Sequence, residues 1–158
     1  MLHTLNRTQI HAPPELVYQL AADIGRWPEL LEHYRYVHLL EEGRTGSGLL
    51  RRRAKMSASR SGIPVSWTAT QELRPRERCI LYHHVAGVTK GMDVVWRIEV
   101  AGQIAQVSIE HSLLSSRWWM RTRLAGFIVG RIFVANIADR TLRGIKRHAE
   151  DQATMKVS

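Results

Sequence analysis

Two polar side chains, Arg52 and His111, stand in otherwise apolar rows of predicted β-strands. The inward row of the strand expected over residues 49–59 reads Leu50, Arg52, Ala54, Met56 and Ala58. A buried guanidinium is costly unless a carboxylate or an acidic ligand pairs with it. Arg52 could therefore anchor an enol, carboxylate or quinone oxygen. Alternatively, it lies near the end of the strand and its head group reaches water.

His111 lies on the strand expected over residues 104–113. Its row there is Ala105, Val107, Ile109, His111 and Leu113. An imidazole ring titrates near neutral pH, so His111 could act as a general acid or base. The alternative is a structural histidine that keeps one neutral tautomer in a hydrogen bond. Arg52 and His111 are the catalytic candidates that the sequence offers.

The motifs of the common catalytic and cofactor sites are absent from the sequence. It contains no nucleophile elbow, zinc-binding helix motif or dinucleotide fingerprint. The glycine-rich stretch at 46–48 lies between two predicted strands and lacks the lysine of a phosphate-binding loop. His83 and His84 are adjacent on one strand and face opposite sides of it, which argues against a shared metal ion. We therefore predict no metal and no cofactor.

The elements that must position these residues follow in a simple order. A strand is expected over residues 4–10, and Ala12-Pro13-Pro14-Glu15 then opens a helix. A second short helix contains Trp27. Further strands are expected at 36–40, 49–59, 63–73, 79–85, 92–100 and 104–113. Their short connections make the sheet antiparallel, and their alternation leaves one face apolar.

A long helix over about residues 115–150 is the only predicted element large enough to cover that apolar face. It contains no proline, and its broad apolar stripe comprises Leu124, Phe127, Ile128, Val134, Ala135, Ala138, Leu142 and Ile145. Residues 1–150 are predicted to form a single domain. Residues 151–158 are predicted to form a flexible tail.

The composition favours an ordinary globular protein: 44% of the 158 residues are hydrophobic and 23% are charged. The single cysteine excludes an internal disulfide and a cysteine-rich zinc site. We expect a cytoplasmic protein, because no signal peptide and no apolar run of about 20 residues is present. The net charge of +9 favours nucleic acid, an anionic membrane or an acidic ligand as partner, or simply a solvated basic surface.

The order of elements and the opening IHAPPELVYQLAADIGRWPELLEHYRYVHLLE resemble the START/polyketide-cyclase superfamily, also called SRPBCC. The likeness is to its polyketide cyclase/dehydrase or coenzyme Q-binding branch. The matching motifs are Ala12-Pro13-Pro14-Glu15, Val17-Tyr18, Ala22-Asp23 and Arg26-Trp27-Pro28. The resemblance implies an α+β helix-grip fold: a seven-stranded curved antiparallel sheet wraps around a long C-terminal helix, with two short helices after the first strand. It also implies an elongated cavity, in which known members bind lipids, polyketides, quinones or hormones.

The expected function is the binding or transport of such a hydrophobic small molecule, driven by burial of apolar surface at about 25 cal/mol per Å². The residues expected to contact it are Arg52, Met56, Trp67, Trp96, His111, Phe127 and Ile128. The alternative is an enzyme, a polyketide cyclase, aromatase or dehydratase. An enzyme needs at least two polar groups that converge in the cavity, whereas a purely apolar lining would favour a carrier.

A second alternative is a basic interaction module that acts on RNA, the ribosome or a membrane. No aromatic–basic motif for RNA recognition is visible, which makes nucleic acid the less favoured partner. Trp118 and Trp119 lie beside arginines at the start of the long helix, a composition that favours peripheral contact with an anionic membrane. The alternative there is a set of ordinary exposed arginines over a buried stripe.

Overall fold

A computed structural model describes residues 2–113 and 124–157 of the chain, with side chains described over 2–113 and 132–156. The first strand, two short helices and a 3-10 turn come first: β1 (Leu2–Ile10), α1 (Pro14–Ala22), η1 (Ile24–Arg26) and α2 (Trp27–Leu30). Six strands follow: β2 (Tyr34–Arg44), β3 (Leu50–Arg60), β4 (Ile63–Arg74), β5 (Cys79–Gly87), β6 (Asp93–Ala101) and β7 (Ile104–Leu113). The helix α4 (Leu124–Val157) ends the chain.

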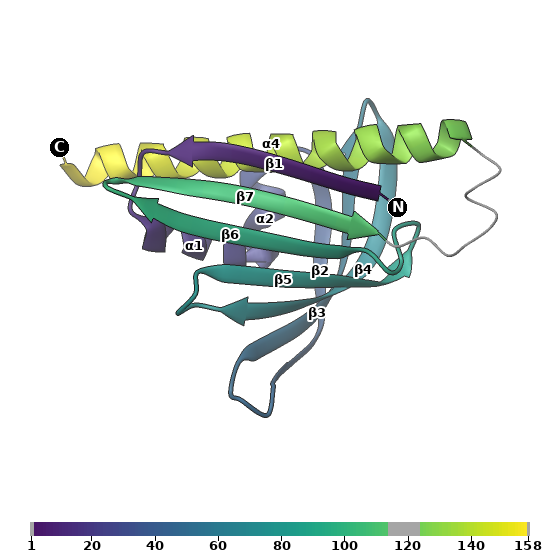
Figure 1. Ribbon diagram of the computed structural model, residues 1–158, viewed down its shortest axis with the longest axis horizontal. Helices are drawn as coiled ribbons and strands as arrows, with labels where there is room; N and C mark the ends of the chain where they lie inside the picture. Colours follow the sequence, from purple (N-terminus) through teal and green to yellow (C-terminus); the bar gives the residue numbers. More distant parts are fainter. Residues whose placement is uncertain (1, 114–123, 158) are drawn as a thin grey trace.

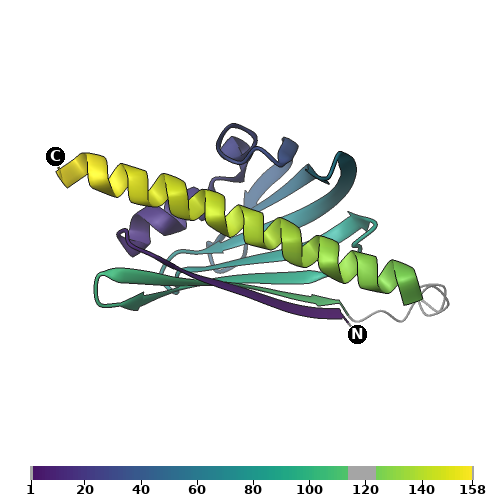
Figure 2. The ribbon, with the colours of Figure 1, turned by 90° about the horizontal axis from the view of Figure 1, so that it is seen from above.

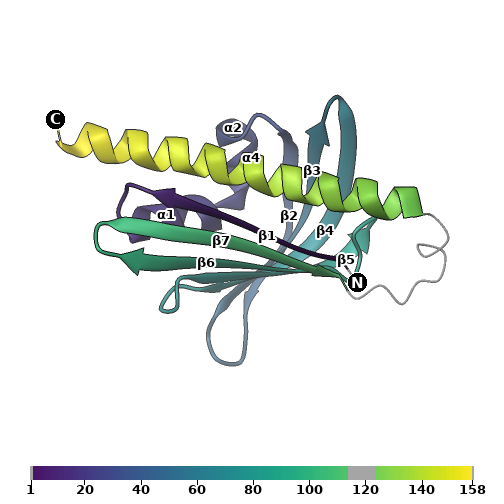
Figure 3. The same ribbon diagram turned by 45° about the horizontal axis from the view of Figure 1, so that its top comes forward.

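The strands form one seven-stranded sheet in the order β1-β7-β6-β5-β4-β3-β2, and every neighbouring pair is antiparallel. The sheet curves beneath α4, which crosses it along its length (Figures 1 and 2). The turned view shows α1 and α2 beside the same helix (Figure 3). The helix-grip fold predicted from the sequence is confirmed.

The C-terminal helix differs from the prediction at its end. Helical structure continues to Val157, across the segment for which a flexible tail was expected. Residues 151–157 contain neither glycine nor proline, so nothing in the sequence stops the helix at Glu150. The predicted start near residue 115 lies outside the described residues.

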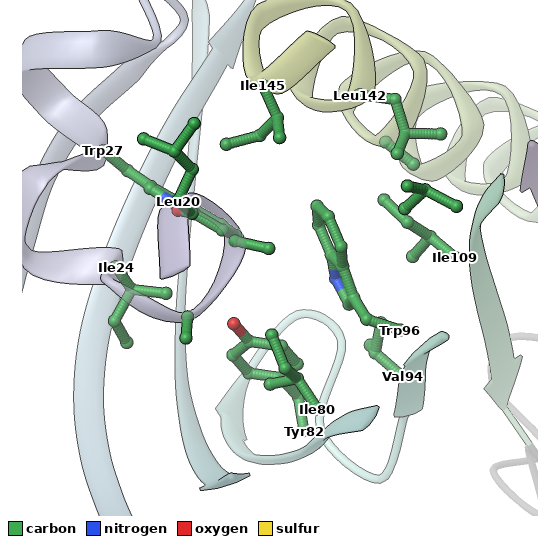
Figure 4. Packing of buried hydrophobic residues seen from close by; sticks show 14 of the residues in the cluster. Leu20, Ile24, Trp27, Ile80, Tyr82, Val94, Trp96, Ile109, Leu142 and Ile145 are labelled. Atoms are coloured by element: carbon green, nitrogen blue, oxygen red, sulfur yellow. The ribbon is translucent and has the colours of Figure 1, made fainter. Parts of the chain in front are cut away.

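The inner face of the sheet carries the predicted alternate rows. Ala54, Met56 and Ala58 of β3 are buried, and so are Ala105, Val107 and Ile109 of β7. Figure 4 shows Ile80, Trp96 and Ile109 of the sheet facing Leu142 and Ile145 of α4, with Trp27 at the side. Alternation along each strand therefore places one apolar set against the helix, as a sheet with one wet face requires.

A close approach between α4 and the chain after α2 depends on Gly144. A Cβ atom at this position would overlap the Cδ2 methyl of the buried Leu31. Glycine costs about 1 kcal/mol relative to alanine within a helix. Here it lets the helix backbone pack directly against Leu31.

Candidate functional site

A cavity of about 70 Å³ lies between the inner face of the sheet and α4. It is lined by Trp27, Tyr34, Met56, Val65, Trp67, Tyr82, His84, Thr89, Met92, Val94, Trp96, Ile109, His111, Phe133, Val134, Ile137, Ala138 and Thr141. Pockets that enclose drug-sized ligands measure roughly 300–1,000 Å³. A ligand of that size would therefore require the lining side chains or α4 to move.

Four of the residues singled out in the sequence border this cavity: Met56, Trp67, Trp96 and His111. Arg52 does not line it. The side chains of Phe127 and Ile128 lie outside the described residues. The two inward tryptophans of separate strands are thus brought to one space, together with one of the two candidate catalytic side chains.

Aromatic rings form a continuous wall of the cavity. Trp27 contacts Trp96 at 5.9 Å between ring centroids and Tyr34 at 5.0 Å, in an edge-on arrangement. Tyr34 contacts Trp67 at 6.2 Å, again edge-on. Trp67 in turn lies parallel to His84, at 5.7 Å and with 3° between the ring planes. Such pairs add about 0.5–1.5 kcal/mol beyond the burial of their surface and hold each ring in a defined orientation.

The Trp67–His84 stack depends on an irregularity between β4 and β5. The register of this pair shifts between Thr68 and Ala69, and Trp67 is paired with Gly87. Gly87 has φ +95°, and a Cβ atom there would lie 2.6 Å from the Ser66 carbonyl oxygen. Only glycine adopts this conformation so close to a neighbouring strand without strain.

The turn that follows Gly87 fixes the second ring of the stack. The Nδ1 atom of His84 and the hydroxyl of Thr89 are hydrogen-bonded at 2.6 Å. The His84 amide donates to the Met92 carbonyl, and the Gly91 amide donates back to the His84 carbonyl. The ring of His84 is therefore held from both its backbone and its side chain.

Two histidines of the cavity are neutral at physiological pH. Burial, with smaller effects from His111 and His83, lowers the pKa of His84 to about 3. Burial also lowers the pKa of His111 to about 4. The buried Nδ1 atom of His111 has no hydrogen-bond partner among the residues that the structure describes. An unsatisfied buried polar atom costs about 1–3 kcal/mol, and a ligand that bonded to it would remove that cost.

A third buried histidine lies behind the cavity wall. The Nε2 atom of His33 is 2.9 Å from the Thr141 hydroxyl, which itself donates to the Ile137 carbonyl at 2.7 Å. Since that hydroxyl proton is used, His33 donates from Nε2. Burial and the charge of Arg140 lower the pKa of His33 to about 4. This network joins the start of β2 to α4 next to the cavity.

Arg52 stands on the far side of Tyr82 from the cavity, in a hydrogen-bond network centred on the buried Gln71. Its Nε donates to Gln71 Oε1 at 2.9 Å, and its Nη2 donates to the Ala22 carbonyl at 2.6 Å. The Gln71 amide nitrogen donates to the Tyr82 hydroxyl and to the same carbonyl, both at 3.0 Å. The guanidinium thus bonds to protein oxygens, and it also supports a side chain that lines the cavity.

Among the described residues, no cluster of three or more histidine, cysteine, aspartate or glutamate side chains could hold a metal ion. The described part of the chain also contains no helix with the length and hydropathy needed to cross a bilayer.

Comparison with known proteins assigns the family. The profile described as "Polyketide cyclase / dehydrase and lipid transport" matches residues 10–140, which is most of the chain. The chain belongs to the polyketide cyclase/dehydrase and lipid transport family. This family lies within the START-like, or SRPBCC, superfamily, so the resemblance seen in the sequence is confirmed.

Individual members of the family are distant relatives. The "Granaticin polyketide synthase bifunctional cyclase/dehydratase" of Streptomyces violaceoruber is 35% identical over 74 residues, which are 46% of this chain and 21% of that protein. The chain therefore matches only about a fifth of that relative's length.

Solved structures share the fold over nearly the whole chain. The Zhui aromatase/cyclase of Streptomyces sp. R1128 superposes with a TM-score of 0.73 and 19% identity, over 99% of this chain and 95% of that one. A START superfamily protein of Mycobacterium smegmatis gives a TM-score of 0.62 and 14% identity, over 98% and 99% of the two chains. At these identities the likeness concerns the fold alone.

Sequence reasoning missed several polar residues of the site, above all His84. The signal was present, because Ile80, Tyr82 and His84 alternate on β5 and the first two favour the inner face. The sequence argument treated His83 and His84 as a metal pair and did not ask which one faces inward. Tyr34 and Thr141 had no comparable signal, because each lies at a junction of elements whose relative placement is tertiary.

Proposed function

We propose that this family member binds a hydrophobic small molecule with a planar ring, in the lipid, quinone or polyketide range, within the cavity beneath α4. The observation that carries the proposal is an aromatic-walled cavity that contains one buried, unpartnered nitrogen, His111 Nδ1. Flat rings would stack or pack edge-on against the tryptophans, and an oxygen of the ligand would bond to His111.

The proposed contacts differ in kind. Met56, Trp67 and Trp96 would contribute apolar surface, and His111 would orient the ligand. Arg52 would act through Gln71 on Tyr82, without contacting the ligand in the present conformation. Phe127 and Ile128 stay proposed contacts from the sequence.

An enzymatic role is the second candidate, because His84 and His111 both reach the cavity and a relative is named a cyclase/dehydratase. A general base works best with a pKa near the working pH. At a pKa of about 4 the His111 ring is a weak base, so its geometry suits hydrogen bonding to a ligand better than proton abstraction. Binding is therefore ranked first. A dehydratase would instead release water from a β-hydroxyketone, and its rate would fall on His111→Asn.

The test of binding fills the cavity from α4. Ala138 is buried and lines the cavity, so Ala138→Leu adds three carbons directly into it. We expect native mass spectrometry to find a co-purified hydrophobic molecule in the wild-type protein, and tryptophan fluorescence to change on titration with phenol or 2-naphthol. In Ala138→Leu the affinity for these probes should fall at least about tenfold, because the added side chain occupies the same volume.

Ala101→Leu is the matched control, since Ala101 is exposed near the turn between β6 and β7. It should bind the probes like the wild-type protein. Equal affinity in Ala138→Leu and the wild type, or no binding of either probe together with no co-purified molecule, would contradict the proposal.

A further inference from the structure

Two strongly exposed aliphatic side chains lie on separate hairpins at one end of the molecule. Ile63 is 65% exposed, directly after the turn between β3 and β4, and Val88 is 70% exposed in the turn between β5 and β6. Figures 1 and 2 show both turns at the end of the sheet where α4 begins. Aliphatic residues this exposed at the ends of turns contribute nothing to the core, so they are available to a partner.

Both residues border the cavity. Ile63 lies on the same face of β4 as Val65 and Trp67, which line it, and Val88 directly precedes Thr89, which also lines it. Because Trp67 is paired with Gly87, β4 extends beyond that pair to Ile63 by about 13 Å, at 3.3 Å per residue. Ile63 and Val88 therefore flank the same edge of the cavity.

The two turns hold these side chains in fixed positions. Ser61 and Gly62 both have positive φ, at +51° and +78°, which is the conformation of a tight two-residue hairpin turn. In the other turn the Lys90 amide donates to the Gly87 carbonyl, and Thr89 is bonded to His84. The apolar tips are thus presented by rigid hairpins.

The charge at these tips is positive. Arg60 ends β3, Lys90 is exposed in the second turn, and residues 59–64 and 86–92 contain no aspartate or glutamate. The next acidic residue, Asp93, is engaged on the outer face of the sheet by His83 Nδ1 at 2.6 Å. Exposed aliphatic groups beside cations are the combination that contacts the interface of an anionic bilayer.

We propose that the two-hairpin tip, defined by Arg60, Ile63, Val88 and Lys90, docks on an anionic lipid surface and opens the cavity toward it. A second copy of the chain is a poorer occupant, because two such tips would bring like charges together. The purpose of the contact rests on the proposed function, since a membrane would be the source or destination of the ligand. The contact itself can be measured without any ligand.

The experiment is co-sedimentation of the full chain with vesicles of phosphatidylcholine and phosphatidylglycerol at low salt. We expect the wild-type protein to bind them, to lose affinity as salt rises, and to bind pure phosphatidylcholine more weakly. Ile63→Asp and Val88→Asp should each weaken binding at least about tenfold, because each places a carboxylate at an anionic interface. Both sites are exposed and external to the core, so the variants should stay folded.

Val100→Asp is the matched control. Val100 is 52% exposed in a comparable hairpin, but near the end of β6, at the opposite end of the sheet (Figure 1). It should bind the vesicles like the wild type. The proposal is overturned if the wild type does not sediment with anionic vesicles, or if Val100→Asp loses as much binding as Val88→Asp. Concentration-dependent self-association of the wild type that Val88→Asp abolishes would also overturn it in favour of a second copy. Probe binding without vesicles, unchanged in Val88→Asp, tests the cavity separately.

Discussion

At the scale of single residues, Arg52 shows how a cation can be accommodated inside a sheet without a carboxylate. Its partners are the amide oxygen of Gln71 and the carbonyl of Ala22, which is the last residue of α1. Carbonyls at the C-terminal end of a helix carry partial negative charge, so this position favours a guanidinium. Gln71 is the shared partner, because its amide also bonds to Tyr82 and Ala22.

Replacement of Gln71 by methionine tests this network. Gln71→Met keeps the length of the side chain but leaves Arg52 Nε and the Tyr82 hydroxyl without their buried partner. We expect the free energy of unfolding to fall by about 2–3 kcal/mol, measured by urea denaturation. Thr70→Val is the control, since Thr70 is the preceding residue and faces the opposite side of β4. It should change the stability by much less, and equal losses in the two variants would contradict the role of the network.

At the scale of elements, the pairing of β4 with β5 decides the geometry of the site. A register shift and the positive φ of Gly87 bring the backbone of β5 against Ser66 and Trp67. The shift allows Trp67 and His84 to stack. A regular ladder would carry the two rings at different heights along the strands.

Gly87→Ala should therefore be damaging. The added Cβ would lie 2.6 Å from the Ser66 oxygen and 2.8 Å from the Trp67 Cα, both backbone atoms that cannot rotate away. We expect a loss of at least about 2 kcal/mol in urea denaturation and a shift of tryptophan emission as the Trp67 ring moves.

Gly102→Ala separates the strain of positive φ from the overlap. Gly102 has φ +64° but no atom within 4 Å of an added Cβ. It should cost only about 1 kcal/mol, the price of a left-handed conformation. A cost for Gly87→Ala no greater than this would show that the close approach is unimportant.

At the scale of the whole molecule, three buried histidines link stability to pH. His33 and His84 are buried and His111 is partly so, and the pKa of each lies below the ordinary 6.5, at about 4, 3 and 4. The unfolded chain takes up protons on these rings near pH 6.5, whereas the folded protein stays neutral until well below pH 5. Between these values the unfolded state binds more protons, so acidification favours it.

The protein should therefore lose stability as the pH falls from about 7 to about 4. Each histidine contributes at most about 1.4 kcal/mol per pH unit within this window. Urea denaturation at a series of pH values measures the slope. In His33→Asn, which should keep the bond to Thr141 without a titrating ring, the slope should be smaller. A midpoint that does not change between about pH 7 and pH 5 would contradict the buried neutral state of the rings.

The sequence by itself determined which residues face α4, because alternation along a strand and the apolar stripe of a helix are local properties. It therefore predicted the rows that contain Met56, Trp67, Trp96 and His111, and the covering helix. Only the tertiary structure decided that Arg52 bonds to Gln71 and Ala22, that His84 stacks on Trp67, and that about 70 Å³ stays unfilled. These features arise from the register between strands and from the volumes of side chains far apart in the chain, which no local pattern records.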